Sequence, residues 1–238
     1  MTDRLQDNLN RVTEEIAAAC ARSNRLPSEV TLVAVTKYAE LDWIRRLVAL
    51  GVRDLGESRP QQLLERAQTL TSSDGSTDCQ SPIRWHMIGH LQRNKVRPIL
   101  SQAILIHSVD SLKLLERISS IAGEMMLVPR VLLEVNVSGE SSKDGISAEE
   151  LRSQWDAFVE VSGVEICGLM TMAPLADDPT AARPVFRALR QLRDELAARS
   201  RSHIMLTELS MGMSGDFTVA IDEGATIVRI GSRLFEGL

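Results

Sequence analysis

Lys37 is the residue whose position most directly suggests chemistry, because it ends a short run of apolar and β-branched residues. Residues 31–36 are typical of a strand buried on both faces, and the lysine comes where that strand emerges. Desolvation of an ammonium there favours the free amine, the form that condenses with an aldehyde to give a Schiff base. On this run alone a plain polar strand end is the favoured interpretation. The rest of the chain reverses that preference.

Two segments near the C-terminus could bind an anion. Residues 210–216, Ser-Met-Gly-Met-Ser-Gly-Asp, stand directly before a predicted helix, where backbone N–H groups and the helix dipole favour negative charge. Ser214 adds a hydroxyl to this turn. Arg229, Gly231 and Ser232 end a later strand, with a glycine that lets a ligand approach the backbone and a second hydroxyl donor. The alternative is that the glycines only shape turns and Ser214 only caps a helix.

Hydrophobic periodicity predicts that strands alternating with helices position these residues. The eight predicted strands cover residues 31–37, 52–57, 85–90, 103–108, 130–137, 164–172, 203–210 and 225–231. Helices are predicted over residues 2–22, 42–50, 58–70 and 217–223, and from residues 112, 147 and 178 onward. Residues 71–82 are interpreted as a surface loop and residues 91–95 as a polar turn.

Eight such units, within the roughly 250 residues usual for the fold, predict one α/β domain over residues 1–238: a (β/α)8 TIM-type barrel with an extra N-terminal helix. A doubly wound open sheet is the second choice, but residues 37–41 contain no glycine for its phosphate-binding turn. In a barrel all strands open their carboxyl ends on one face, so Lys37 faces both anion-binding segments. This arrangement predicts a phosphorylated aldehyde as the ligand, and pyridoxal 5′-phosphate (PLP) is the obvious candidate.

Composition narrows the class of partners. A net charge of −5, with 25% charged and 44% hydrophobic residues, gives no reason to expect nucleic acid or an anionic membrane. No apolar run reaches membrane-spanning length, and the first residues lack the apolar core of a signal peptide. The three cysteines are far apart and odd in number, so we expect no metal site, no disulfide and a reducing cytoplasm.

Short motifs follow one another along nearly the whole chain. They are Leu-Val-Ala-Val-Thr-Lys-Tyr at 32–38, Leu-Gly-Glu at 55–57, Trp-His-Met-Ile-Gly at 85–89, Leu-Gln at 91–92, Asn-Lys at 94–95, His-Ser-Val-Asp at 107–110, Gly-Leu-Met-Thr-Met-Ala-Pro at 168–174, Leu-Ser-Met-Gly-Met-Ser at 209–214 and Val-Arg-Ile-Gly-Ser at 228–232. In this order they resemble the motifs of the pyridoxal phosphate homeostasis protein family, and so many in order make a specific match.

The resemblance implies a barrel similar to the N-terminal domain of alanine racemase, with PLP bound covalently to Lys37 and no established catalytic turnover. It also implies PLP homeostasis: holding PLP, delivering it to PLP-dependent apo-enzymes and affecting the balance of amino acids and keto acids. Ser58 departs from the family, which usually carries asparagine there, and the nearby Pro60 is also unusual. The expected cofactor-binding residues are Lys37, Ser58, Ser210, Met213, Ser214, Arg229, Gly231 and Ser232, with no catalytic residue and no metal ligand.

Two features of the residues favour a non-catalytic role. Arg229 lies on the same strand face as Gly231, and a cation that reaches the pyridine nitrogen would disfavour its protonation and leave the ring a poor electron sink. Tyr38 is the only tyrosine and directly follows Lys37, so in extended backbone the two side chains point to opposite faces. Because the chain ends at Leu238, we expect no second domain to supply a further proton-transfer group, and we expect a monomer.

Two other functions remain open at this point. One is a small PLP-dependent enzyme, an amino-acid racemase or lyase. The other is a barrel enzyme for phosphorylated sugars that forms its own Schiff base through Lys37. An absorption band of bound PLP separates the PLP-binding functions from the sugar enzyme, and turnover of amino acids separates the homeostasis protein from the racemase or lyase.

Overall fold

The computed structural model describes residues 3–72, 82–137, 144–200 and 204–238. Eight parallel strands follow one another in the order β1-β2-β3-β4-β5-β7-β8-β9, and pairing of β9 with β1 closes them into a barrel. This confirms the predicted (β/α)8 barrel and rules out the open sheet. The strands are β1 Thr31–Val35, β2 Asp54–Glu57, β3 Arg84–Met87, β4 Ala103–Val109, β5 Arg130–Asn136, β7 Glu165–Met170, β8 Glu208–Ser210 and β9 Ile227–Ile230.

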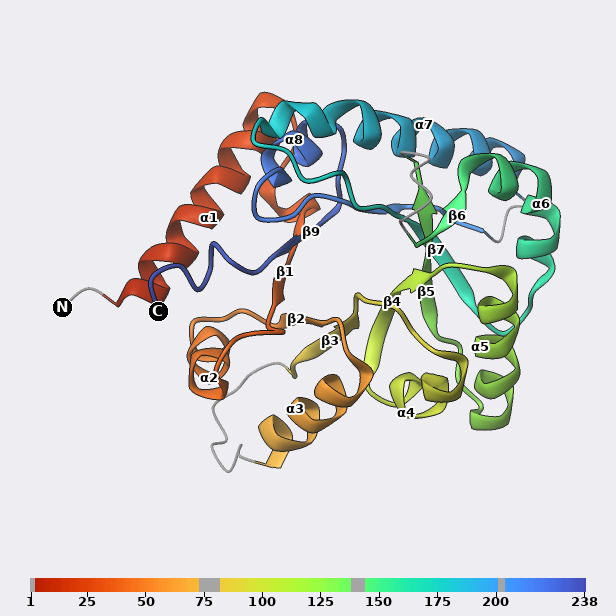
Figure 1. Ribbon diagram of the computed structural model, residues 1–238, viewed down its shortest axis with the longest axis horizontal. Helices are drawn as coiled ribbons and strands as arrows, with labels where there is room; N and C mark the ends of the chain where they lie inside the picture. Colours follow the sequence, from red (N-terminus) through yellow and green to blue (C-terminus); the bar gives the residue numbers. More distant parts are fainter. Residues whose placement is uncertain (1–2, 73–81, 138–143, 201–203) are drawn as a thin grey trace.

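Helices surround the barrel on its outside (Figure 1). Their starts follow the local signals, as at α6, where the Ser147 hydroxyl accepts a hydrogen bond from the N–H of Glu150. Leu151, Trp155 and Phe158 of this helix are buried. The α-helices are α1 Arg4–Arg22, α2 Leu41–Ala49, α3 Pro60–Ser72, α4 Val96–Leu100, α5 Leu112–Met125, α6 Ala148–Glu160, α7 Arg183–Arg199 and α8 Phe217–Asp222; the 3-10 helices are η1 Pro27–Glu29, η2 Arg93–Lys95 and η3 Pro179–Ala182.

Helix α1 precedes the first strand and packs beside α8, and the two ends of the chain lie close together (Figure 1). The amide of Asn8 joins them, because Nδ2 donates to the carbonyl oxygens of Leu234 and Glu236 at 3.1 and 3.0 Å. The predicted apolar stripe of α1 is buried: Leu5, Leu9, Val12, Ile16 and Ala19.

The structure differs from the predicted elements where the segments are very short. The expected polar turn at 91–95 becomes η2 and leads into α4, whose five residues are too few for periodicity to reveal. A two-residue strand, β6 (Ile146–Ser147), pairs with β5 and was not predicted. Strand β8 is shorter than the predicted 203–210. Helix α3 extends to Ser72, and the rest of the predicted surface loop up to residue 81 lies outside the described residues, as does Cys79.

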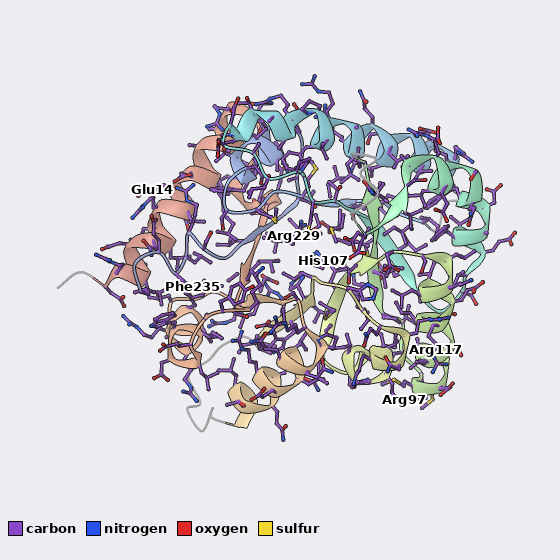
Figure 2. The ribbon with its side chains drawn as sticks, viewed as in Figure 1. Glu14, Arg97, His107, Arg117, Arg229 and Phe235 are labelled. Atoms are coloured by element: carbon purple, nitrogen blue, oxygen red, sulfur yellow. The ribbon has the colours of Figure 1, made fainter. Side chains whose placement is uncertain are left out.

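The interior of the barrel combines an apolar layer with polar side chains. Val33, Leu105, Leu132, Cys167, Met170 and Ile227 form a buried apolar cluster of their own. Inside the same ring of strands lie the buried polar residues His86, His107, Ser210 and Arg229. Figure 2 shows His107 and Arg229 within the ring of helices, well away from the outer surface. Buried polar groups need hydrogen-bond partners, and these residues provide them for one another.

Candidate functional site

A cavity of about 810 Å³ opens at the carboxyl ends of the strands, the end at which the sequence predicts the site. Ser210 is the one expected cofactor-binding residue that does not line this cavity, because its side chain is fully buried behind Arg229. The other seven line it together: Lys37, Ser58, Met213, Ser214, Arg229, Gly231 and Ser232.

Lys37 is exposed, and its Nζ lies 5.0 Å from the centre of the Tyr38 ring. Strand β1 ends at Val35 and a turn includes Lys37 and Tyr38, so the alternation of strand side chains no longer applies to them. Two expectations were therefore wrong: the lysine is not desolvated by burial, and Tyr38 lines the same cavity as Lys37. The amine is accessible to an aldehyde.

A buried network beneath Lys37 fixes the turn that carries it. Glu57, at the end of β2, is fully buried and accepts a hydrogen bond of 2.5 Å from the Thr36 hydroxyl and another from Arg66. Arg66, from α3, also donates to the carbonyl oxygen of Ala39 at 2.9 Å, on the other side of Lys37. Burial raises the pKa of Glu57, although Thr36 and Arg66 favour its charged form. This positioning role of Glu57 and Arg66 was not predicted from the sequence.

Gly212 fixes the turn between β8 and α8. Its φ of +93° lies in the region that favours glycine, and a Cβ there would come within 2.6 Å of the Cβ of Ala220 in α8. Gly212 also approaches strand β9, since its carbonyl oxygen accepts the N–H of Arg229 at 3.0 Å. The glycine brings the turn, α8 and β9 together at the cavity wall.

Two of the donors expected for the anion are engaged within the chain. The N–H of Met213 donates to Oδ1 of Asp216 at 2.6 Å, and the N–H of Gly231 donates to Oγ of Ser214 at 3.2 Å. The hydroxyl proton of Ser214 remains able to donate, because this contact uses only its oxygen lone pair. Among the cavity-lining residues of these two segments, Ser214, Gly215 and Ser232 have backbone N–H groups without a protein acceptor in the described part of the chain.

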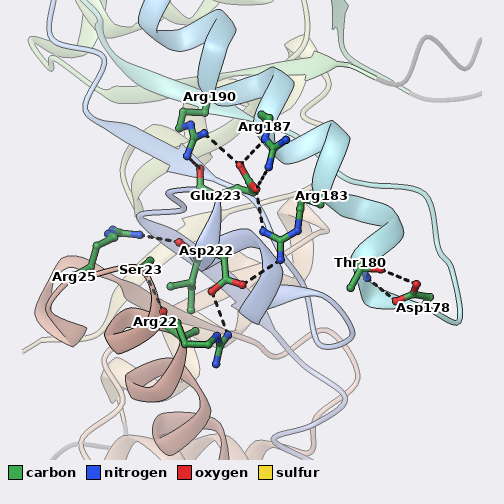
Figure 3. A network of polar contacts seen from close by, with 12 residues as sticks. Arg22, Ser23, Arg25, Asp178, Thr180, Arg183, Arg187, Arg190, Asp222 and Glu223 are labelled. Carbon is green, nitrogen blue, oxygen red and sulfur yellow. Dashed lines mark hydrogen bonds and ion pairs between the residues drawn. The ribbon is translucent and has the colours of Figure 1, made fainter.

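Helix α8, which backs this turn, is anchored by an acidic pair at its end. Asp222 pairs with Arg22 of α1, and Glu223, only 3% exposed, receives three arginine side chains of α7 (Figure 3). Burial opposes ionisation of Glu223, but hydrogen bonds from arginine outweigh it and lower the pKa of this carboxyl. The network fixes the turn between β8 and α8 against the outer helices. The three arginines of α7 are Arg183, Arg187 and Arg190.

Arg229 reaches the cavity from inside the barrel and is 4% exposed. Its Nη1 donates to the Ser210 hydroxyl oxygen at 2.5 Å and its Nη2 to the carbonyl oxygen of Thr171 at 3.0 Å. Burial lowers the pKa of Arg229 to about 10, while the charges of Glu134 and Asp216 act in the opposite direction. The guanidinium is therefore cationic at neutral pH and is held in one orientation by two acceptors.

These groups match the chemistry of a phosphorylated aldehyde. An accessible amine can condense with the aldehyde, free neutral N–H and hydroxyl donors can replace water around a phosphate, and a fixed cation can contact an aromatic ring nitrogen. Among the described residues, no three His, Cys, Asp or Glu side chains gather in a way that could hold a metal ion. The helices of the described segments also include none with the length and apolar character of a membrane span.

Comparison with known proteins gives a consistent result. The family model for the N-terminal domain of alanine racemase matches residues 3–237. A pyridoxal phosphate homeostasis protein of Aquifex aeolicus is 41% identical over 229 residues, which cover 96% of each chain. The structure of PipY from Synechococcus elongatus with PLP bound is 36% identical, with a TM-score of 0.80 over 92% of this chain and 99% of that one. An alanine racemase of Clostridium difficile, 16% identical, shares the fold with a TM-score of 0.72 over 98% of this chain and 59% of its own.

Proposed function

Since the chain belongs to the family of pyridoxal phosphate homeostasis proteins, with the alanine racemase N-terminal domain fold, we propose that it holds PLP as a Schiff base on Lys37. It would keep the cofactor available, deliver it to PLP-dependent apo-enzymes and so affect the balance of amino acids and keto acids. The observation that carries the proposal is that the exposed Lys37 amine shares one cavity with free backbone donors and a buried arginine.

The phosphate is assigned to the two backbone segments that meet at Ser214 and Gly231. The N–H groups of Ser214, Gly215 and Ser232 supply neutral donors that have no other acceptor among the described residues. The Ser214 hydroxyl can add a further hydrogen bond without breaking its contact with Gly231. Of the residues expected to hold the phosphate, Ser214 and Ser232 therefore keep free N–H groups, whereas those of Met213 and Gly231 are engaged within the chain.

The role of Arg229 supports holding over turnover. PLP supplies an electron sink for carbanions when its pyridine nitrogen is protonated. A cation that points at that nitrogen disfavours the proton, and Arg229 carries its charge at neutral pH. The orientation fixed by Ser210 and Thr171 therefore favours a cofactor that is stored in an unreactive form.

An amino-acid racemase or lyase remains the second candidate, and Tyr38 is the observation that favours it. The tyrosine lines the cavity beside Lys37, so the site contains a second group that can transfer a proton, contrary to the expectation from the sequence. Racemisation of a panel of single-enantiomer amino acids by the PLP-loaded protein and by Tyr38→Phe decides between the candidates. Turnover that Tyr38→Phe abolishes would favour the enzyme; no turnover in either protein favours the homeostasis role.

We further propose that the chain works as one domain, as a monomer in the cytoplasm. Every group assigned to the cofactor comes from the strand ends and loops of a single barrel, which supports a site complete in one copy. The buried free thiols of Cys20 and Cys167 agree with a reducing compartment. Light scattering over a range of concentrations tests the monomer, and a dimer that persists on dilution would refute it.

The binding proposal is tested by the absorption spectrum of the purified protein after incubation with PLP and removal of the excess. The parent should keep a visible band of bound cofactor, and Lys37→Ala should lose it. Lys113→Ala is the matched control, because Lys113 lines a different cavity, beside His90 and Asp110. Delivery is tested by adding the PLP-loaded protein to an apo-enzyme in the presence of a scavenger of free PLP; recovery of apo-enzyme activity supports direct transfer.

A further inference from the structure

A continuous chain of side-chain hydrogen bonds runs through the barrel interior and ends at Arg229. Oδ1 of Asp54 lies 3.0 Å from Nε2 of His86, and Nδ1 of His86 lies 2.9 Å from Nε2 of His107. Nδ1 of His107 lies 2.8 Å from the Ser210 hydroxyl oxygen, which accepts the Nη1 proton of Arg229. Four links therefore connect a carboxylate at the start of β2 with a guanidinium at the cavity.

This series of hydrogen bonds spans the barrel from one end to the other. Asp54 and its partner Arg84 line a separate cavity of about 720 Å³ at the amino ends of the strands. Between the two cavities the side chains are almost sealed from solvent, since His86 is 3% exposed and both His107 and Ser210 are fully buried. None of these links was predicted from the sequence.

The two ends fix the direction in which the protons point. An ionised Asp54 can only accept a hydrogen bond, and Arg229 can only donate. Hydrogen bonds from His86 and Arg84 keep the pKa of Asp54 below its ordinary value despite its burial, so this carboxylate is ionised at neutral pH. His86 must then donate through Nε2, and a neutral His86 must accept at Nδ1 from Nε2–H of His107.

A neutral His107 continues the same pattern, since its Nδ1 accepts the Ser210 hydroxyl proton and leaves the Ser210 oxygen free for Arg229. With both imidazoles neutral and protonated at Nε2, every link is satisfied. A charged His86 would reverse the middle links and leave the Ser210 hydroxyl proton in the interior without an acceptor, which is costly.

The surrounding charges agree with a neutral His107. Burial above all, together with the charge of Arg229, lowers the pKa of His107 well below its ordinary value. The charge of Glu134, from β5, opposes the lowering of the Arg229 pKa. Burial raises the pKa of Glu134 itself to about 7. The interior next to Arg229 therefore favours neutral groups.

We propose that Asp54, His86, His107 and Ser210 form an interior relay of fixed direction that positions the Arg229 guanidinium toward the ring nitrogen of bound PLP. The direction of the relay follows from the contacts and from the ionised Asp54 at one end and the cationic Arg229 at the other, whereas its purpose rests on the proposed function. These four are positioning residues, because they act on the cofactor only through Arg229. A network that merely satisfied buried polar groups would stabilise the barrel without affecting the electronic state of the ligand.

The first test uses the ligand-free protein and does not depend on PLP. Nitrogen-15 NMR of the histidine rings reports the tautomer and charge of each imidazole, and the chain has only four histidines to assign. His86 and His107 should both be neutral and protonated at Nε2 at neutral pH. His90, whose side chain is 55% exposed, lies outside the relay and serves as the internal reference. A charged imidazole, or a proton on Nδ1 of either relay histidine at neutral pH, overturns the relay.

The second test asks whether the relay acts on the cofactor. Ser210→Ala removes the acceptor of Arg229, so it should displace the absorption maximum and pH midpoint of bound PLP and weaken PLP binding about 2- to 10-fold, as for one lost hydrogen bond. Ser210→Thr keeps the hydroxyl and should restore the parent spectrum. His86→Phe, three links from Arg229, should displace the maximum in the same direction, whereas His90→Phe should leave it unchanged.

An unchanged spectrum in both Ser210→Ala and His86→Phe would refute positioning through the relay. If PLP does not bind at all, the proposed function fails while the NMR result on the ligand-free protein still decides the direction of the relay. The two failures are therefore distinguishable.

Discussion

The hydroxyl oxygen of Ser214 accepts the N–H of Gly231 at 3.2 Å and so joins the turn after β8 to the end of β9. Both residues line the cavity that contains Lys37. The contact keeps two distant segments at a fixed spacing around the place assigned to the phosphate. The turn after β8 and the end of β9 then present their free N–H groups to the same cavity.

Ser214→Ala should weaken the retention of PLP. It removes a hydroxyl donor to the phosphate and leaves the Gly231 N–H without its present acceptor. Loss of a hydrogen bond to a charged group costs roughly 1.5–3 kcal/mol, or about 10- to 100-fold in affinity. The absorption maximum of the bound cofactor should hardly change, because the ring partner is intact. Equilibrium dialysis measures retention, Ser214→Thr serves as the control, and full retention by Ser214→Ala would reduce Ser214 to a structural role.

Asp216→Asn should have the opposite effect on retention. The Asp216 carboxylate lines the cavity and accepts the Met213 N–H at 2.6 Å, so its charge opposes a phosphate nearby. An asparagine oxygen can still accept that N–H, but without the charge. Removing one like charge in a partly screened site should contribute about 1 kcal/mol, roughly a fivefold slower loss of PLP. Asp156→Asn on α6 is the control; faster loss of PLP from Asp216→Asn than from the parent would contradict the prediction.

Arg229→Gln should change the spectrum of bound PLP more than its retention. Glutamine can replace part of the hydrogen bonding to Ser210 and Thr171 but carries no charge. Without the cation, the ring nitrogen should protonate more readily, and the pH midpoint of the absorption band should rise. A pH titration of the spectrum checks this result. An unchanged midpoint would mean that Arg229 does not reach the ring nitrogen.

Glu134→Gln should stabilise the protein at alkaline pH. Burial raises the pKa of Glu134 to about 7, above its value of roughly 4.3 in the unfolded chain. At pH values between these two pKa values, the folded protein keeps a proton on Glu134 that the unfolded chain has lost. Glu134 therefore lowers the free energy of unfolding as the pH rises toward 7. Glutamine cannot ionise. The free energy of unfolding of Glu134→Gln, relative to the parent, should therefore be about 1–3 kcal/mol higher at about pH 8 than at about pH 5.

Urea unfolding at the two pH values measures this difference. Glu116→Gln, a substitution of the same kind on the exposed side of α5, is the matched control. An equal effect of Glu134→Gln at both pH values would show that Glu134 is ionised as easily in the folded protein as in the unfolded chain.

The sequence predicted those features of the site that depend on regular strands and helices. The short strand β2 lies within the predicted residues 52–57, and the positions of Lys37, Ser214 and Ser232 at strand ends follow from the barrel. The side-chain direction of Tyr38 was predicted wrongly, because it depends on where β1 stops and a turn begins. Beyond Val35 the alternation of side chains in a strand no longer governs where Lys37 and Tyr38 point.

Contacts between residues far apart in the chain could not be predicted in the same way. His107 and Ser210 are separated by 103 positions and meet only because β4 and β8 both face the barrel interior. The competition of Asp216 for the Met213 N–H likewise depends on the exact turn after Gly212. Residue types suggested an anion site, but only the folded backbone reveals which N–H groups remain free.

The most direct test of the central claim is borohydride reduction of the PLP-loaded protein, followed by peptide mapping with mass spectrometry. Reduction fixes a Schiff base as a stable pyridoxyl label on the lysine that formed it, and the chain contains four lysines. The account predicts the label on Lys37, and no label in Lys37→Ala. A label on Lys95, Lys113 or Lys143 in the parent, or an unmodified Lys37 in protein that retains PLP, would contradict it.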